Sequence, residues 1–199
     1  MLVRQPLVGT YQFDQGWMRV NFYRMGSSDF DISSRTDYPG SKASVREILD
    51  LANSYYQAAH VLFGESQKNL VPLSSAPARM AAIHAIERYV NAFLRHEGVA
   101  PGEIRKRMHD LDEPTLVDKL KLRKRTALHL KVMTARREYL IARYAPERVT
   151  DHTELNRLSA TLVEVMMKVD NYVASSDRFS RTQRDVSAPP AASSQRRRG

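Results

Sequence analysis

The chain contains no cysteine among its 199 residues. Disulfide bonds, thiolate metal ligands and a cysteine nucleophile are therefore all excluded, although the redox compartment stays open. Long apolar runs are missing as well, since no stretch approaches the roughly 18 consecutive apolar residues that a membrane-spanning helix requires. The first residues, MLVRQPLVGTYQFDQ, lack the uninterrupted apolar region of a signal peptide, because Pro6, Gly9 and Asp14 break it. We therefore expect a cytoplasmic protein with no membrane partner.

The motifs of metal-dependent and nucleotide-hydrolysing enzymes are absent too. The six histidines form no H-E-x-x-H pair or other compact ligand set, so no metal ion is expected. These histidines are His60, His84, His96, His109, His129 and His152. No G-x-x-x-x-G-K-S/T or G-x-G-x-x-G loop occurs either, so we expect no cofactor, and any nucleotide must bind through a groove between helices and cationic side chains.

Positive charge is abundant and concentrated in one stretch. The formal net charge is +9 at pH 7, which favours anionic partners such as nucleic acid, nucleotides or an acidic protein surface. Between residues 119 and 143, nine lysines and arginines stand against Glu138 alone, a local charge of +8. The run KLKLRKR at 119–125 either contacts several phosphates or forms the solvated face of an amphipathic helix. The candidate binding residues are Lys119, Lys121, Arg123, Lys124, Arg125, Arg136 and Arg137.

Composition divides the chain into three parts. Residues 1–43 are an N-terminal extension and linker, in which alternating residues on either side of DQG at 14–16 indicate a short β-hairpin or, alternatively, irregular structure. Residues 44–173 carry apolar residues at helical spacing and are expected to form the folded domain. Residues 174–199 are rich in serine, proline, alanine and arginine with little to bury, which predicts a disordered basic tail. Its QRRR end either attracts an anionic partner or is simply disordered.

The helices of the domain can be placed by their start and stop signals. Serines before Val45 begin the first helix and Gly64 follows its end, whereas Ser75 and Gly98 bound the second. A short helix begins at Asp112 and Pro114, a longer one follows and ends before Pro146, and the last runs from Thr153 to about Val173. We therefore predict an all-α protein, an antiparallel up-and-down bundle of four to five helices.

Three blocks in this order resemble the HEPN family, the higher eukaryote and prokaryote nucleotide-binding domains. The blocks are AIHAIERYVNAFLRHEGV at 82–99, HDL at 109–111 and REYLIARYAPE at 137–147, with Ala145 departing from the family's RYP-like end. The resemblance covers residues 44–173 and implies a helical bundle, a homodimer and RNA or nucleotide as partner. The signature residues that it implies are His84, His109, Asp110, Leu111, Arg143, Tyr144 and Pro146.

Some HEPN proteins are ribonucleases that carry an arginine, four to six residues and then a histidine, so that a cation and a proton carrier meet at one phosphodiester. Arg79 with His84 matches loosely, but five residues along a helix rotate by about 500°, which leaves the two side chains on different faces. Arg123 with His129 also matches and lies later in the bundle, with Lys124 where a polar residue is more typical. Both pairs stay catalytic candidates, although the sequence favours a non-catalytic module.

His109 and its neighbours allow two interpretations. His109 and Asp110 could act as an acid–base pair, because a carboxylate can orient an imidazole and raise its pKa. Alternatively, Asp110 or Asp112 caps the next helix and His109 satisfies backbone groups of the preceding turn.

The sequence thus leaves three hypotheses: a non-catalytic bundle that binds RNA or nucleotide, a metal-independent toxin-like ribonuclease, and an interaction scaffold for a protein encoded by a neighbouring gene.

Overall fold

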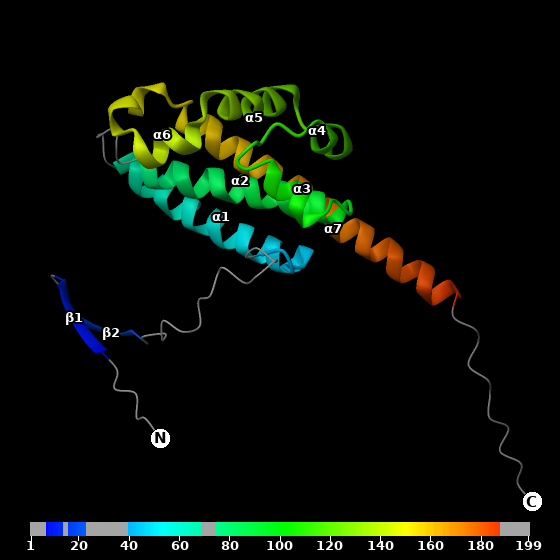
Figure 1. The fold of residues 1–199 in the computed structure, drawn as a ribbon, viewed down its shortest axis with the longest axis horizontal. Helices are drawn as coiled ribbons and strands as arrows, with labels where there is room; N and C mark the ends of the chain where they lie inside the picture. The colour runs from blue at the N-terminus through cyan, green and yellow to red at the C-terminus, as the bar shows by residue number, and fades with distance from the viewer. Residues whose placement is uncertain (1–6, 14–15, 23–39, 69–74, 188–199) are drawn as a thin grey trace, which may run out of the picture. The chain divides into compact units, whose positions relative to one another are not determined.

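The computed structural model describes residues 7–13, 16–22, 40–68 and 75–187 of the chain. These residues belong to two compact units, 1–40 and 41–199. The second unit is helical, as Figure 1 shows, which confirms the predicted all-α class for it. None of its helices within the described ranges combines the length and the apolar content needed to cross a bilayer.

The first unit contains two strands, β1 (Leu7–Phe13) and β2 (Gly16–Phe22). They pair antiparallel, with Leu7 opposite Phe22 and Phe13 opposite Gly16. The strands coincide with the alternating segments on either side of DQG at 14–16, for which a hairpin is one of the two interpretations. The rest of the predicted extension and linker, up to residue 39, lies outside the described residues.

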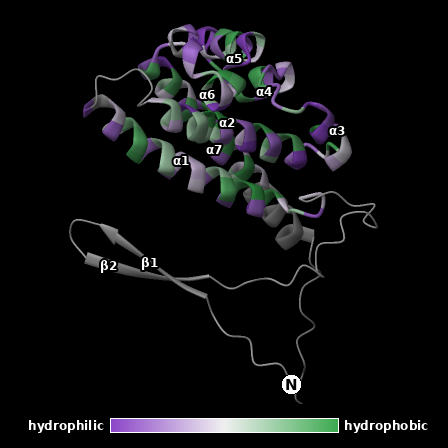
Figure 2. Cartoon of the chain, turned by 60° about the vertical axis from the view of Figure 1, so that its left-hand side comes forward, coloured by the Kyte–Doolittle hydropathy of each residue, from purple (hydrophilic) through white to green (hydrophobic). Residues whose placement is uncertain are grey.

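The second unit is built around one central helix. Its elements are α1 (Val45–Lys68), α2 (Ala76–His96), α3 (Pro101–Lys106), α4 (Pro114–Leu120), α5 (Lys124–Arg136), α6 (Glu138–Tyr144), the 3-10 helix η3 (Pro146–Asp151) and α7 (Leu155–Ser187). Helix α2 packs against α1 on one side and against α7 and α6 on the others. Figure 2 shows apolar residues along the packed sides of these helices and hydrophilic residues on the outer turns of α5 and α6.

The core consists of the apolar stripes that the sequence predicted. Tyr89 and Phe93 of α2 are fully buried, and they meet Leu116 of α4, Leu130 of α5 and Leu158 of α7 in one continuous cluster. Burying side chains of this size stabilises a fold by about 1.5–3 kcal/mol each, so this shared interior holds four helices together.

Two helix boundaries follow the predicted signals. At the start of α1, the backbone N–H of Glu47 donates to Ser44 Oγ at 3.2 Å while Ser44 N–H donates to Glu47 Oε2 at 2.9 Å, which is a reciprocal capping box. At the end of α2, Gly98 has φ +83° and Val99 N–H donates to the Leu94 carbonyl at 3.0 Å. This arrangement closes the helix with a left-handed residue, the conformation that glycine adopts without strain.

Other predicted boundaries were wrong. Helix α1 passes through Gly64 and ends at Lys68, because Phe63 and Ser66 are buried on either side of the glycine and continue the packed face. The cap of α4 is Glu113, whose carboxylate accepts from Thr115 N–H at 3.0 Å, and not Asp112. Thr153 does not cap α7, since its backbone N–H and its hydroxyl are both bonded to Glu138.

The number and length of the later helices also differ from the prediction. Helix α3 was not predicted, and the single helix expected through the basic region divides into α5 and α6 at Arg137, which has φ +53°. Helix α7 continues to Ser187, so the first part of the segment expected to be disordered from residue 174 is helical. Residues 188–199, the remainder of that predicted tail, lie outside the described residues.

Candidate nucleic-acid interface

The predicted basic residues from 119 to 131 lie on the outside of α4 and α5. In KLKLRKR the leucines Leu120 and Leu122 are buried, whereas the cations between them are exposed. A tight turn produces this alternation: Lys121 is left-handed with φ +49°, and Leu122 N–H donates to the Val117 carbonyl at 3.1 Å. We define the basic surface by its exposed members, which are Lys119, Lys121, Arg123, Lys124, Arg125 and Lys131.

Two members of the basic surface are neutralised by carboxylates from other helices. Lys119 pairs with Glu97 at the end of α2. Arg123 pairs with Glu164 of α7, its Nε donating to Oε2 at 2.6 Å and its backbone N–H donating to Oε1 at 2.8 Å. Thr126 Oγ1 donates to the same carboxylate at 2.7 Å, so Glu164 caps the start of α5. Arg123 therefore has a structural partner.

The remaining members of the basic surface carry charge that no carboxylate neutralises. Within the described part of the chain, Lys121, Lys124, Arg125 and Lys131 form no ion pair with an acidic side chain. Uncompensated exposed cations attract anions and release counterions when they meet a phosphate backbone. These four side chains are the part of the predicted set that is free to bind.

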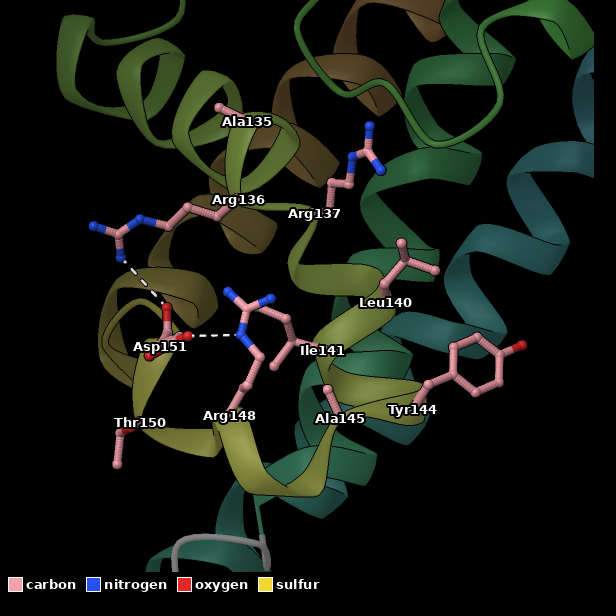
Figure 3. Close-up of a pocket in the computed structure, with 10 residues that line it drawn as sticks. All are labelled: Ala135, Arg136, Arg137, Leu140, Ile141, Tyr144, Ala145, Arg148, Thr150 and Asp151. Carbon is pink, nitrogen blue, oxygen red and sulfur yellow. Dashed lines mark hydrogen bonds and ion pairs between the residues drawn. The ribbon is translucent and has the colours of Figure 1, made fainter.

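Arg136 and Arg137 lie at the other end of α5, in a groove of about 870 Å³ formed with α6 and η3 (Figure 3). We call it the arginine groove. Its lining residues are Ala135, Arg136, Arg137, Leu140, Ile141, Tyr144, Ala145, Arg148, Thr150 and Asp151. The groove joins two of the predicted binding residues to Tyr144 from the RYAP block, which the sequence alone did not place together.

The arginine groove is positively charged. Arg148 Nε donates to Asp151 Oδ2 at 2.8 Å, and Arg136 Nη1 donates to the Asp151 carbonyl oxygen at 3.4 Å. In Figure 3 both guanidinium groups point toward Asp151, whereas Arg137 and Tyr144 point away from it. The groove thus holds three guanidinium groups and one carboxylate, and that carboxylate pairs with Arg148. Tyr144 is 68% exposed, and the guanidinium carbon of Arg143 lies over its ring, 5.4 Å from the ring centre.

Arg148 is a lining residue of the groove that was not predicted from the sequence. It lies in η3, a short 3-10 helix that begins at Pro146 and ends at Asp151. Proline at the start of a turn and an acidic residue three positions after the arginine were the only local signals, and both are common. Arg148 lines the groove because η3 packs near the end of α5, and this packing is part of the tertiary structure, which a local sequence pattern does not show.

The first candidate catalytic pair is not brought together. Arg79 is buried, with its Nε donating to Ser75 Oγ at 3.2 Å, and its Nη1 has no hydrogen-bond partner in the described structure. His84 is half-buried beside the ring of Tyr55, with the ring centroids 5.5 Å apart. No contact joins Arg79 to His84 within the described residues, as expected for two side chains on different faces of α2.

The second candidate pair is also divided between different environments. His129 is buried, with Nδ1 2.8 Å from Thr161 Oγ1 and Nε2 2.8 Å from Thr153 Oγ1. The hydroxyl of Thr153 donates to Glu138 Oε2 at 3.1 Å, so it must accept from His129, which makes Nε2 the protonated nitrogen and Nδ1 the acceptor from Thr161. Arg123, by contrast, is bound to Glu164.

These hydrogen bonds keep the imidazole of His129 neutral. We call the residues that form them the buried polar network, which consists of Glu138, Thr153, His129 and Thr161. Burial, followed by the nearby positive charges of Arg157 and Arg79, lowers the pKa of His129 to about 4. One of these two charges is that of the buried Arg79, which is the arginine of the other candidate pair. Burial lowers the pKa of Arg79. The charge of the fully buried Glu138 acts in the opposite direction and favours the protonated form of Arg79.

The HDL block makes contacts that differ from both of its interpretations. The carboxylate partner of His109 is Glu87 of α2 rather than Asp110, with 2.9 Å between Nδ1 and Oε2. Asp110 Oδ1 accepts from Asp112 N–H at 2.9 Å and thereby shapes the turn before α4. Leu111 is buried, and its N–H donates to Thr134 Oγ1 at 2.9 Å.

Three signature residues of the resemblance gather near α2. The rings of His84 and His109 lie 6.5 Å apart, and the His109 ring lies 4.2 Å from that of Tyr139. Burial lowers the pKa of His84, and the charge of Arg143 lowers it further. Tyr144 and Pro146 lie instead at the arginine groove and at the start of η3. The signature blocks are thus divided between this histidine cluster and the groove.

Comparison of the chain with protein-family models, curated proteins and solved structures found no match. No group of three or more histidine, aspartate or glutamate side chains suited to a metal ion occurs among the described residues. The site must therefore be interpreted from its own chemistry, which is that of exposed cations on the basic surface and of arginines with an exposed tyrosine in the arginine groove.

Proposed function

We propose that this protein is a non-catalytic helical bundle that binds RNA or a nucleotide through the basic surface and the arginine groove. The observation that carries the proposal is the exposure of Lys121, Lys124, Arg125 and Lys131 without carboxylate partners in the described part of the chain. A fold held together by its apolar interior does not need these charges. Their concentration on one pair of neighbouring helices supports a polyanionic partner.

The arginine groove supplies the second part of the proposed interface. Guanidinium groups contact phosphate oxygens with two parallel N–H donors, which suits Arg136, Arg137 and Arg148. The exposed ring of Tyr144 provides a surface on which an unpaired base can stack, an interaction of about 1–3 kcal/mol per base. Single-stranded RNA presents phosphates and unpaired bases together, so it fits this combination better than duplex RNA.

The basic surface can be tested by charge neutralisation. We expect Lys121→Gln, Lys124→Gln and Arg125→Gln combined to weaken binding of a short single-stranded RNA about tenfold or more, measured by fluorescence anisotropy, because three phosphate contacts are lost. The matched control neutralises three exposed lysines on other helices, Lys68, Lys106 and Lys168. Arg123 is left unchanged in this test, since its pairing with Glu164 stabilises the start of α5.

Equal effects of the two triple substitutions would contradict the proposed surface, because they change the net charge of the protein equally. Competition with mononucleotides separates the two ligand classes. Displacement of the RNA by a nucleoside triphosphate at similar concentration favours a nucleotide ligand, whereas displacement only by oligonucleotides favours RNA.

The arginine groove has its own test. Tyr144→Ala is expected to weaken RNA binding about tenfold through the loss of stacking, while Tyr144→Phe retains the ring and the affinity. The ring is largely exposed, so neither change should lower the melting temperature appreciably. Unchanged affinity of the alanine variant would remove the groove from the interface.

The ribonuclease hypothesis stays as an alternative proposal. Its candidate pair Arg123 and His129, and the less favoured Arg79 and His84, would each need to meet at one phosphodiester. The contacts of Arg123 with Glu164 and of His129 with two threonines support structural roles for both side chains. Incubation of RNA with the purified protein, followed by the same assay on His129→Ala with its fold verified, tests the alternative directly.

We also propose, from the resemblance alone, that the protein forms a homodimer, and the scaffold hypothesis adds a protein partner encoded nearby. Light scattering distinguishes a chain of 22.7 kDa from a dimer of twice that mass. Co-purification with the product of an adjacent gene, without bound RNA, would favour the scaffold over the binding module.

A further inference from the structure

A second groove, of about 490 Å³, lies where the start of α1, the end of α2 and α7 meet. It is lined by Ser44, Val45, Arg46, Leu49, Asn53, His96, Asp170, Val173 and Ala174. We call it the Asp170 groove. Its residues do not overlap with those of the basic surface or the arginine groove, and its volume lies in the range of small-molecule pockets, about 300–1,000 Å³.

Asp170 is the only carboxylate among the lining residues, and it has no partner. Its side chain is half-buried on α7 and makes no hydrogen bond or ion pair with any described residue. A carboxylate that loses water without gaining a partner is unfavourable, which is why burial raises the pKa of Asp170. A cation in the groove would remove this cost.

The cationic side chain at the rim does not supply that partner. Arg46 is engaged by Asp50 of its own helix, with Nη2 3.0 Å from Oδ1 and Nε 3.2 Å from Oδ2. Its distant charge only partly offsets the burial of Asp170. The imidazole of His96 is likewise packed edge-on against Tyr172, with ring centroids 5.8 Å apart.

The polar side chain of Asn53, which also lines the groove, is already paired. The hydroxyl of Tyr89, on α2, donates to Asn53 Oδ1, on α1, at 2.5 Å. This bond occupies the acceptor oxygen of Asn53. Tyr89 is fully buried, and the negative charge of Asp170 contributes, after burial, to raising its pKa. The hydroxyl of Tyr89 is thus bound to Asn53 and, among the described residues, gives no hydrogen bond to the Asp170 carboxylate.

Part of the lining is apolar. Leu49 and Val173 are buried core residues whose side chains also line the groove, together with Val45 and Ala174. A ligand therefore meets one unpaired carboxylate and an aliphatic surface, beside polar groups that include the guanidinium of Arg46, which is paired with Asp50. An ion with a charged head and a short hydrocarbon stem satisfies both features, because the stem buries apolar surface while the head pairs with the carboxylate.

We propose that the Asp170 groove binds a small aliphatic ammonium ion, with the ammonium group on Asp170 and the alkyl stem against Leu49 and Val173. The site is independent of the proposed RNA-binding function, since it shares no residue with it.

The test uses n-butylammonium as the probe and methyl-labelled full-length protein, followed by nuclear magnetic resonance. We expect saturable shifts of the Leu49 and Val173 methyl signals, with n-butanol binding at least tenfold more weakly because it lacks the charge. Asp170→Asn should weaken binding about tenfold or more. The control Asp118→Asn, which removes one exposed carboxylate on α4, should leave it unchanged.

A second variant blocks the groove without changing its charge, so that a loss of binding in Asp170→Asn can be compared with a loss caused by filling the groove. Ala174→Trp adds a bulky side chain at the exposed rim, keeps Asp170 and should abolish the shifts by filling the groove. Absence of saturable shifts in the wild-type protein, equal binding of butanol, or undiminished binding by Asp170→Asn would each overturn the proposal. The triple lysine and arginine variant of the basic surface should bind the probe normally, so failure of one site is distinguishable from failure of the other.

Discussion

At the scale of single residues, the buried polar network decides what His129 can do. Both ring nitrogens are occupied by threonine hydroxyls, and protonation of Nδ1 would break the bond that it accepts from Thr161. The positive charges of Arg157 and Arg79 oppose protonation as well. His129 therefore stabilises the packing of α5 on α7 as a neutral group, and a proton-transfer role would require the network to open.

The lowered pKa of His129 predicts a dependence of stability on pH. In the unfolded chain the imidazole takes up a proton near pH 6.5, whereas in the folded protein it does so only at about 4. Between these two pH values the unfolded state binds more protons than the folded state. The contribution of His129 to the free energy of unfolding is therefore complete above pH 6.5 and decreases by about 3 kcal/mol as the pH falls toward 4. Urea denaturation at several pH values measures it, and His129→Gln should show a shallower decline. An equally steep decline in the variant would contradict this assignment.

A second residue-scale prediction concerns Glu138. Its carboxylate is fully buried, accepts two bonds from Thr153 and lies near the buried cation Arg79. Glu138→Gln keeps an acceptor but removes the compensating charge, so we expect a loss of about 2–4 kcal/mol in unfolding free energy. The control Glu103→Gln breaks only an exposed pair with Lys106 and should change stability by less than about 0.5 kcal/mol. Similar losses in the two variants would show that Glu138 is not coupled to Arg79.

Residue spacing could not reveal these partners. The spacing of an arginine and a histidine indicates the pair Arg123 and His129, but Arg123 binds Glu164 of α7. The neighbouring positions in HDL indicate His109 and Asp110, but His109 binds Glu87 of α2. Such long-range pairing depends on how helices pack, which a local pattern does not encode. The exposure of the cations at 119–125 was predictable, because the leucines between them had to turn inward.

At the scale of elements, two glycines of identical chemistry have opposite roles. Gly64 lies inside α1 with nothing within 4 Å of an added Cβ, whereas Gly98 ends α2 with φ +83°. The sequence predicted both as stop signals, and only Gly98 is one. A glycine lowers helix stability by only about 1 kcal/mol, which the packing of α1 against α2 can outweigh.

Alanine at each position distinguishes the two roles. Gly64→Ala should stabilise the protein by about 0.5–1 kcal/mol, because the helix gains a better helix former and the space is open. Gly98→Ala should destabilise it by about 1–2 kcal/mol, because a side chain must adopt the left-handed conformation. Thermal and urea denaturation of the two variants measure these changes, and effects of the same sign would contradict the assigned conformations.

At the scale of the whole molecule, the helical core could be predicted mainly from the periodic spacing of apolar residues. Leu116, Leu130 and Leu158, which lie on three predicted helices, are all buried in one core. The break at Arg137 and the short helix α3 escaped prediction, because left-handed residues other than glycine leave little trace in a sequence. The same break forms the arginine groove, so the basic surface could be predicted from the sequence and the groove could not.

The salt dependence of RNA affinity tests the central claim most directly. Each phosphate contact on a single strand contributes about 0.7 to the slope of log affinity against log salt concentration. Removing Lys121, Lys124 and Arg125 together should therefore reduce the magnitude of the slope by about 2, while the Lys68, Lys106 and Lys168 control keeps the wild-type slope. Identical slopes for the wild-type protein and both variants would contradict the assignment of the basic surface as the RNA-binding site.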